Sequence, residues 1–563
     1  MLPLIHINRN LRSLKRYREV LGILVTHGFD QVVEQLNLDY YLEIGRQLVR
    51  RNSEKKQLER LPTPVRLRMA MEKLGPTFIK LGQTLSSRPD ILPADYLREL
   101  NKLQDSVQPI ALNEIKRHIE KELGAPIDTL FATFSSEPVA AASIAQVHQA
   151  TLPDGTAVAV KVRRPSIEKI IETDIDILNG LAALLEKHGF LENICSPVEI
   201  VKEFNRTIYR EIDFTKEGHT FGRFRTNFEH NNSVYIPQVF WEFSSEAVLT
   251  MEYIDGIKIS EIQRLENAGY DLKQIAQVGA QSFLEQVLSH GLFHGDPHPG
   301  NILVLPENKI CFLALGMIGY LGEDLKLQLA NLLLGLYKRD IDLLISVMLT
   351  AREQSKEVNI ASLKRDLSEF IDDYYQIPLE RINSFKLINE FIVMMKAHHI
   401  KFPSDLMLLA KALMTIEGIG RQLDPSFNLV EQIQPAVTEL IKQRLSGSSI
   451  QKEITQTLRA YSDVARTLPR DIKELMYRIN NNNFKIDLEH RGLEKLITDL
   501  DKSSNRLSFS FLIGSLIIGS SLIMQSQSGP HIFGIPALGL LGYTIAGALG
   551  LWLAIGILRS GRL

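Results

Sequence analysis

The spacing of apolar and polar residues divides this chain of 563 residues into segments of different kinds. Apolar positions recur at helical spacing up to about residue 125, and strand-like alternation takes over between residues 126 and 256. Helical spacing returns from residue 257. Apart from a β-hairpin predicted at 302–313, it continues without strands past Gly316 to about residue 500. Two long uncharged runs, at 507–524 and 535–558, follow near the C-terminus.

These segments predict an α+β protein of several domains, because 563 residues exceed what one hydrophobic core usually organises. The composition is ordinary, with 45% hydrophobic and 23% charged residues, and the formal net charge of −2 gives no reason to expect a nucleic-acid partner. The predicted parts are a solvated N-terminal helical arm (1–60), a helical extension (61–125), a mainly β lobe (126–256), a mainly helical lobe (257–445), amphipathic helices (446–505) and two apolar helices (506–560).

The segment 294–301 carries the clearest candidate chemistry. Its sequence, His-Gly-Asp-Pro-His-Pro-Gly-Asn, places Asp296 and Asn301 five residues apart, just before the predicted hairpin. Phosphoryl-transfer enzymes use this arrangement: the Asp orients or deprotonates the attacking hydroxyl, and the Asn holds a magnesium ion on the phosphates. Asp296 is therefore the predicted catalytic residue, and Asn301 is the predicted metal ligand.

The triplet after the hairpin departs from the pattern of these enzymes. Kinases have Asp-Phe-Gly there, with the Asp on the metal, whereas this chain has Ala314-Leu315-Gly316. A carboxylate supplies the hard oxygen ligand that Mg²⁺ needs, and a methyl group supplies none. We expect this change to weaken metal–nucleotide binding and catalysis by several kcal/mol.

A nucleotide site is also predicted in the β lobe. An Asp-Gly turn at 154–155 joins two apolar strands, and the second strand ends at Lys161. A Lys there is costly unless its ammonium meets an anion, and the small-residue loop before the hairpin lets phosphate approach the backbone. In a two-lobed kinase the later strand at 247–254 forms the hinge, whose backbone groups read adenine. The candidate ATP-binding residues of loop and hinge are Ala140, Ala141, Ala142, Ser143, Glu252 and Ile254.

Three acids within seven residues, Glu211, Asp213 and Glu217, precede that strand. Read alone, they form a solvated helix start, where acids favour the positive end of the helix dipole. Read as part of a kinase-like site, Glu217 pairs with Lys161, and the other two acids face the nucleotide pocket.

Lys80 and Gln83 lie three residues apart in a predicted helix, so they share one face. Read alone, they are surface residues. Gly82 stands between them, where a neighbouring group can approach closely.

The two uncharged runs predict a membrane hairpin. The first has about 18 residues, roughly 27 Å as a helix, just enough to cross hydrocarbon. Arg506 precedes it, Arg559 and Arg562 follow the second run, and the turn between has no Lys or Arg, so both flanks are predicted to be cytoplasmic. The alternative is a pair of buried helices in a soluble protein. The small residues predicted to bring the helices close are Ser510, Gly514, Ala546, Gly550 and Ala554.

Together these motifs resemble those of the UbiB family of atypical protein-kinase-like proteins, from about residue 60 to the C-terminus. The family carries a Lys-x-Gly-Gln element, an alanine-rich loop in place of a glycine loop, a Glu-x-Asp element and this catalytic loop. The chain departs from the pattern at Ala145, where many members have Gly, at Thr220, where Asn is common, and most seriously at Ala314.

The resemblance implies a protein-kinase-like bilobal fold with an N-terminal helical extension and a C-terminal transmembrane helical hairpin. The extension would lie over the active site and block protein substrates. The implied cofactors are ATP (or ADP) and Mg²⁺, with ATPase activity stimulated by membrane lipid. The residues implied to regulate the site or gate lipid are Lys80, Gln83, Glu211 and Asp213.

The resemblance also implies a role in ubiquinone (coenzyme Q) biosynthesis. The implied partners are membrane lipid, polyprenyl phenol or quinone intermediates and the enzymes of ubiquinone biosynthesis, with homodimerisation left open. The implied location is the inner (cytoplasmic) membrane, as a multi-pass protein with its kinase-like domain in the cytoplasm.

Two other functions stay open at this point. A pseudokinase scaffold would bind nucleotide and lipid without turnover, because Ala314 replaces the metal-binding Asp. A small-molecule kinase is the third, since the catalytic loop also resembles that of aminoglycoside and choline kinases. Those enzymes, however, lack the Lys-x-Gly-Gln extension and the apolar pair.

Overall fold

The computed structural model forms two compact units, Met1–Gln451 and Lys452–Leu563, which are described separately. It describes the chain outside residues 1–10, 31–57, 59, 90, 104–107, 189–195, 351–357, 376–383, 399, 401–402, 430, 434, 436–472, 474–492, 527–529, 533–534 and 560–563. Most of the predicted arm and of the amphipathic helices lies outside the described residues, as does most of a helix predicted at 433–445.

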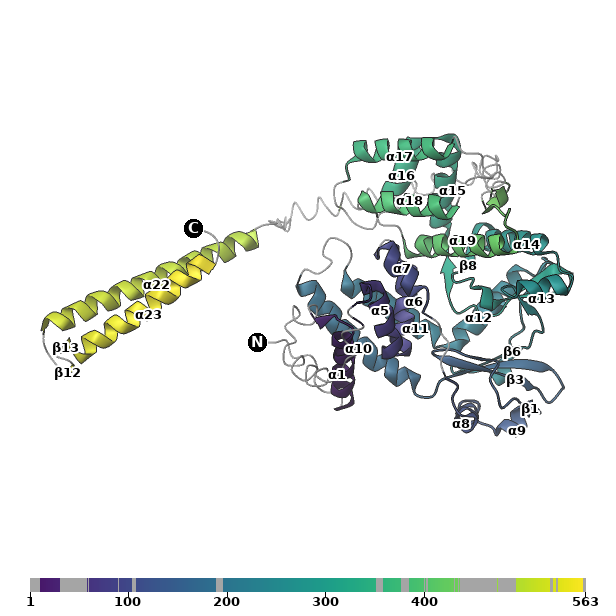
Figure 1. The fold of residues 1–563 in the computed structure, drawn as a ribbon, viewed down its shortest axis with the longest axis horizontal. Coiled ribbons are helices and arrows are strands. Elements are labelled where there is room, and N and C mark those ends of the chain that lie inside the picture. The colour runs from purple at the N-terminus through teal and green to yellow at the C-terminus, as the bar shows by residue number, and fades with distance from the viewer. Residues whose placement is uncertain are drawn as a thin grey trace. The chain divides into compact units, whose positions relative to one another are not determined.

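An antiparallel sheet forms the β lobe, with strands in the order β1-β3-β4-β6 and β2 paired to β3 (Figure 1). The predicted hairpin is confirmed as β3 and β4, and Gly155 in its turn has φ +92°, which glycine adopts without strain. The strands are β1 (Thr133–Phe134), β2 (Ala140–Ala141), β3 (Ala145–Thr151), β4 (Ala157–Arg163) and β6 (Val248–Glu252).

The two faces of β4 join different cores, as strand alternation requires. Val158, Val160 and Val162 are fully buried against α8 (Leu112–Leu123) and α9 (Ile127–Leu130). Ala159, on the other face, belongs to the large core that also holds Phe214 and Phe221 of α12 (Phe214–Asn227).

The catalytic loop lies in the helical lobe, between two small sheets. One sheet has the order β5-β10-β9-β7, and the other pairs β8 with β11. The prediction of no strand beyond Gly316 was wrong. A strand of three residues is too short to show periodicity in the sequence. Its central residue is Gly319, and the Phe293 ring occupies the space that a side chain there would need. The strands are β5 (Val234–Tyr235), β7 (Ile257–Lys258), β8 (Leu292–His294), β9 (Ile302–Leu305), β10 (Lys309–Phe312) and β11 (Ile318–Tyr320).

Helices complete this lobe in two groups. A core of its own joins α16, α17 and α18, whereas α19 packs beside α14 in the main core (Figure 1). Their bounds are α13 (Ile262–Asn267), α14 (Leu272–Glu285), α15 (Glu323–Lys338), α16 (Ile341–Thr350), α17 (Ile360–Tyr375), α18 (Ser384–Ala397) and α19 (Ser404–Leu423).

The helical extension is fixed to the rest of the first unit through α1. The prediction of a solvated arm is wrong for this helix, because its Val20 and Leu21 are buried. Arg16 of α1 donates to Asp174 Oδ1 at 2.8 Å and to the Leu74 carbonyl at 2.6 Å, which ties α1 to α10 and α5. Gly75, with φ +96°, separates α5 from α6. The helices are α1 (Leu11–Thr26), α5 (Thr63–Leu74), α6 (Pro76–Ser86), α7 (Ala94–Leu100), α10 (Ile167–Lys187) and α11 (Pro197–Glu211).

Gly82 of α6 should not tolerate alanine. A Cβ at this position would lie 2.7 Å from Met71 Sδ and would overlap the Leu103 side chain. We expect Gly82→Ala to lower the free energy of unfolding by about 1–3 kcal/mol in chemical denaturation, because the added methyl overpacks the core. Gly22→Ala is the matched control, since no described atom lies within 4 Å of its Cβ position. Equal stability of the two variants would contradict this packing.

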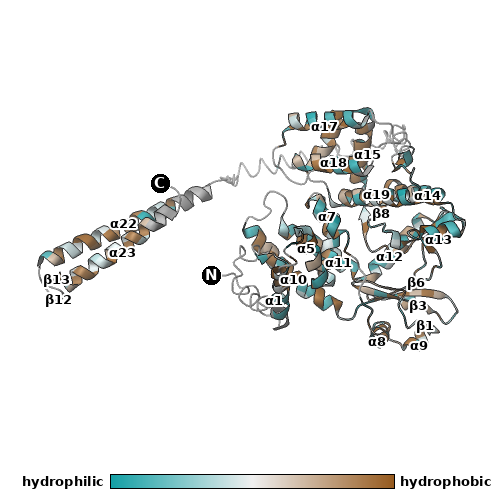
Figure 2. Cartoon of the chain, in the orientation of Figure 1, coloured by the Kyte–Doolittle hydropathy of each residue, from teal (hydrophilic) through white to brown (hydrophobic). Residues whose placement is uncertain are grey.

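The second unit is a hairpin of two long helices, α22 (Leu493–Ser526) and α23 (Ala537–Arg559), with β12 (His531–Ile532) and β13 (Ile535–Pro536) at the turn. Figure 2 shows apolar residues along both helices. Within them, Ser503–Gln525 and Ala537–Ala554 are long and apolar enough to cross a membrane.

The predicted small-residue contacts within the hairpin were wrong except for Ala546, which is 2% exposed. No described atom lies within 4 Å of a Cβ built at Gly514 or Gly550. The helices instead meet where Gly542 faces Ser520 and Gly539 faces Met524. Small residues recur on several faces of these helices, so their spacing alone did not select the contact face.

Candidate active site

The catalytic loop follows β8 and is held by backbone hydrogen bonds on both sides. The Gly295 N–H donates to the Met317 carbonyl at 2.9 Å, and the Leu313 N–H donates to the Asn301 carbonyl at 2.9 Å. The segment 314–317 is therefore tied at both ends to the predicted catalytic loop. Ala314 follows directly after Leu313, which is hydrogen-bonded to Asn301.

Asp296 of this loop is paired with a residue that the sequence analysis missed. Lys411 Nζ of α19 lies 3.4 Å from Asp296 Oδ1, and the Asp296 side chain is 41% exposed. Burial is the largest influence and opposes ionisation of Asp296, but the charge and hydrogen bond of Lys411, together with the neighbouring His294 and His298, hold the pKa of Asp296 below its usual value. The available signal was a lone Lys within the apolar run 406–414, which no sequence motif connects with Asp296.

The two histidines of the loop support its shape. Burial lowers the pKa of His294 to about 4, so this ring is neutral at pH 7. Its Nδ1 accepts a hydrogen bond from the Asp296 N–H at 3.2 Å. His298 Nδ1 accepts from the Gly300 N–H at 3.1 Å. The Nδ1 atoms of both rings therefore act as acceptors that hold the backbone of the loop.

The predicted pair of Lys161 and Glu217 is present in the structure. Lys161 Nζ of β4 lies 2.6 Å from Glu217 Oε2 of α12, and the Glu217 side chain is 4% exposed. The Lys161 ammonium also lies 4.9 Å from the centre of the Phe214 ring, within cation–π range. The bland interpretation of Glu217, a solvated acid at a helix start, is wrong.

The triplet Ala314-Leu315-Gly316 connects this pair with the catalytic loop. A Cβ at Gly316 would lie 3.7 Å from Glu217 Oε1, so the backbone there passes directly beside the ion pair. Leu315 is 1% exposed and fills the core where kinases have Phe. The pair of Lys161 and Glu217 therefore lies beside Gly316, in a segment whose two ends are bonded to the loop of Asp296.

The alanine loop forms a tight hairpin between β2 and β3. Ala140 and Ala141 pair with β3, and the Ala142 N–H donates to the Ala145 carbonyl at 2.8 Å. Arg164 Nε donates to the Ala142 carbonyl at 2.8 Å, which fixes the loop to the end of β4. Ser143 is fully buried.

At the predicted hinge, the Glu252 carboxylate is used within the protein. It accepts hydrogen bonds from the Tyr235 hydroxyl at 2.7 and 2.9 Å. Burial is the main cause that raises the pKa of Tyr235 to about 12, and the Glu252 carboxylate raises it further. The Tyr253 N–H donates to the Ala157 carbonyl. Within the described chain the Ile254 N–H has no acceptor, as an adenine contact would require.

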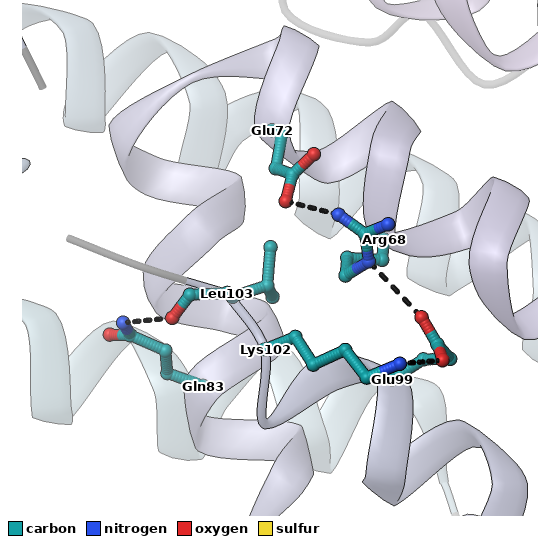
Figure 3. Close-up of polar contacts among 6 residues, drawn as sticks. All are labelled: Arg68, Glu72, Gln83, Glu99, Lys102 and Leu103. Carbon is teal, nitrogen blue, oxygen red and sulfur yellow. Dashed lines mark hydrogen bonds and ion pairs between the residues drawn. The ribbon is translucent and has the colours of Figure 1, made fainter. Parts of the chain in front are cut away.

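The extension reaches the active-site elements through Lys80. Its Nζ lies 2.5 Å from Glu211 Oε1 at the end of α11, and both side chains are mostly covered. Gln83 points elsewhere: its Nε2 donates to the Leu103 carbonyl at 3.2 Å (Figure 3). The same view shows Arg68 bridging Glu72 and Glu99, which braces the extension internally.

The residues present do not fit the usual magnesium clamp of kinases. Asn301 offers one amide oxygen, but Ala314 offers none. Glu211 is paired with Lys80, while Asp213 caps α12 by accepting from Thr215 N–H and Oγ1 and also pairs with a Lys. Across the described residues, no three His, Cys, Asp or Glu side chains gather as a metal site. Both acids are therefore engaged by other groups of the protein in this structure.

Comparison with known proteins gives three matching family models. They are the ABC1 atypical kinase-like domain over residues 102–348, the UbiB helical domain over 367–428 and the ABC1/UbiB kinase-like C-terminal domain over 491–559. Lys411 lies in the second of these, outside the kinase-like domain.

Several full-length relatives are similar. An "Uncharacterized protein in hydrogenase 1 5'region" of Clostridium pasteurianum is 34% identical, over 98% of this chain and 100% of that protein. A "Probable protein kinase UbiB" of Marinobacter nauticus is 33% identical, over 87% of this chain and 90% of that protein. "Protein ACTIVITY OF BC1 COMPLEX KINASE 7, chloroplastic" of Arabidopsis thaliana is 32% identical, over 85% of this chain and 67% of that protein. With its kinase-like lobes, its helical domain and its paired apolar helices, this chain belongs to the ABC1/UbiB family of atypical kinase-like proteins.

Proposed function

We propose that this protein is a membrane-anchored atypical kinase or ATPase that binds ATP and supports ubiquinone biosynthesis. The observation that carries the nucleotide site is the pair of Lys161 and Glu217, packed beside Gly316 and linked through 314–317 to the loop of Asp296. A buried Glu that orients a strand Lys is the arrangement kinases use to hold nucleotide phosphates.

In this proposal different residues bind the phosphates, bind adenine and orient the attacking group. Lys161 holds the phosphates, and the backbone of the alanine loop approaches them without interfering side chains. The Ile254 N–H reads adenine. Asp296, ionised at neutral pH, accepts a hydrogen bond from the attacking hydroxyl or water and orients it toward the terminal phosphorus.

The extension restricts what the site accepts. The ion pair between Lys80 and Glu211 holds α6 against the end of α11, and Gln83 braces the extension from within. We propose that this cover excludes protein substrates and that membrane lipid, or a polyprenyl phenol or quinone, releases it. Lys80, Gln83, Glu211 and Asp213 are the proposed regulatory residues.

The apolar helices supply the proposed membrane anchor. Ser503–Gln525 and Ala537–Ala554 expose most of their side chains within their own unit, as lipid-facing helices do. By the positive-inside rule, Arg506 and Arg559 favour a cytoplasmic position for both flanks and for the kinase-like domain.

A pseudokinase scaffold is the second candidate, and Ala314 is the observation that favours it. Without the carboxylate at this position, the site lacks a ligand that an ordinary kinase needs for its metal. A scaffold of this kind would bind nucleotide and lipid and support ubiquinone enzymes without turnover.

Substitution of Asp296 separates the two candidates. For the full chain in lipid vesicles, we expect Asp296→Asn to reduce ATP hydrolysis by about 10²–10⁴-fold, because it removes the base that orients the attacking group. Asp154→Asn, in the exposed β3–β4 turn, is the matched control. If Asp296→Asn still restores ubiquinone synthesis in deficient cells and the natural chain hydrolyses no ATP, the scaffold is correct.

A further inference from the structure

Lys411 is a largely buried cation that the roles above do not use. It lies in the middle of α19, and its side chain is 17% exposed. Around it on the helix, Met407, Leu409 and Ala412 are buried. An ammonium in such surroundings is costly unless it meets negative charge. Within the described part of the chain, its ion-pair partner is Asp296.

The packing of α19 directs Lys411 at the catalytic loop. Leu408, three residues earlier on the same helix face, lies so close to Gly295 that a Cβ there would be 2.7 Å from Leu408 Cδ2. A glycine at 295 therefore lets the helix dock on the loop. This contact sets Lys411 beside the next residue, Asp296.

The ion pair with Asp296 leaves N–H donors of Lys411 available for another acceptor. The separation of 3.4 Å is longer than the roughly 2.7–2.9 Å of a strong charge-assisted hydrogen bond. An ammonium has three N–H donors, and Asp296 takes at most part of that capacity. The Asp296 side chain is 41% exposed, so the pair lies at an accessible surface of the site.

A nucleoside triphosphate at this site needs positive charge close to Asp296. Its terminal phosphate would otherwise face the Asp296 carboxylate, and like charges a few ångströms apart repel strongly where water is partly excluded. The Nδ1 atoms of His294 and His298 each accept a backbone N–H, so neither of these nitrogens is available to donate to a phosphate. Ala314 cannot hold a metal ion. Among the described residues, the cation that pairs with Asp296 is Lys411.

We propose that Lys411 is a phosphate-binding residue whose ammonium contacts the terminal phosphate of a nucleoside triphosphate, in place of charge that a metal at position 314 would carry. This inference rests on the proposed nucleotide site. It assigns the two lysines to different phosphates: Lys161 to those nearer the nucleoside, and Lys411 to the last one. The affinity for a nucleoside diphosphate should therefore not depend on Lys411.

The test compares a non-hydrolysable ATP analogue with ADP, using the full chain in detergent micelles with EDTA. We expect Lys411→Met to weaken binding of the triphosphate by at least about tenfold and to change ADP affinity less than about threefold. Lys411→Arg, which keeps the charge, should retain most triphosphate affinity. Lys364→Met is the matched control, because Lys364 also pairs with an Asp, on α16, at 2.7 Å.

Lys411→Met leaves Asp296 without its cation and so could fail to fold. A double variant that also removes the Asp296 charge avoids this problem. Lys411→Met with Asp296→Asn should bind the triphosphate more weakly than Asp296→Asn alone. Unchanged or tighter triphosphate binding, or an equal loss for ADP, would overturn the assignment of Lys411. If the natural chain binds neither nucleotide, the proposed nucleotide site itself fails and the inference falls with it.

Discussion

A Lys161→Met variant should lose measurable nucleotide binding and unfold with a free energy about 3–5 kcal/mol lower than the natural chain. The Lys161 ammonium lies 2.6 Å from Glu217 Oε2, and Glu217 is 4% exposed, so the substitution leaves a buried carboxylate without its cation. It also removes the charge that faces the nucleotide phosphates in the proposed site. Calorimetric titration with ADP and chemical denaturation measure the two effects independently.

The two effects can be separated by a second substitution. Lys161→Met combined with Glu217→Leu removes both charges, so it should recover much of the lost stability without recovering binding. Lys258→Met, at an exposed position of β7, is the matched control and should change neither property. If Lys161→Met binds ADP with natural affinity, the nucleotide site does not lie at this pair.

The features that the sequence predicted correctly depend on local pattern. An Asp-Gly turn between alternating strands specifies the β3–β4 hairpin, because few other turns fit strands of this twist. Once the hairpin was placed, a Lys at the end of its second strand required a buried acid, and Glu217 was available in the following helices. Helix breaks at Gly75-Pro76 were equally local, since backbone conformation alone dictates them.

The features that were missed depend on contacts between distant segments. Lys411 pairs with Asp296 across 115 positions of sequence, and no residue near either one signals the other. The Gln83 side chain donates to the Leu103 carbonyl, 20 positions along the chain, and the sequence pattern indicated no such contact. In both cases the residue type was informative and the direction of the side chain was not, because tertiary packing decides that direction.

Position 314 has a different status, because the sequence identified the change and the structure shows its setting. Ala314 follows Leu313, whose N–H donates to the Asn301 carbonyl, and precedes Gly316, whose backbone lies beside Glu217. The acids that might have replaced the missing carboxylate, Glu211 and Asp213, already have partners.

Restoring the acid with Ala314→Asp should make nucleotide binding depend on Mg²⁺. With Asn301 nearby, the new carboxylate completes the pair of oxygen ligands that kinases use. We expect triphosphate affinity in Mg²⁺ to rise by at least about tenfold over the natural chain, and ATP hydrolysis to rise by about 10²-fold, the scale of one well-placed electrostatic group. Titration in Mg²⁺ and in EDTA, with phosphate release, provides the measurements.

The same variant should respond to Mg²⁺ without nucleotide turnover. The added carboxylate lies two residues before Gly316, whose backbone passes beside Glu217, so like-charge repulsion should lower the melting temperature of the variant in EDTA, and Mg²⁺ with nucleotide should reverse the loss. Ala314→Asn has nearly the same shape without the charge and should show neither change. If the natural chain and Ala314→Asp bind and hydrolyse ATP equally, with the same Mg²⁺ dependence, Ala314 does not impair the metal site, and the charge assigned to Lys411 is not a replacement for it.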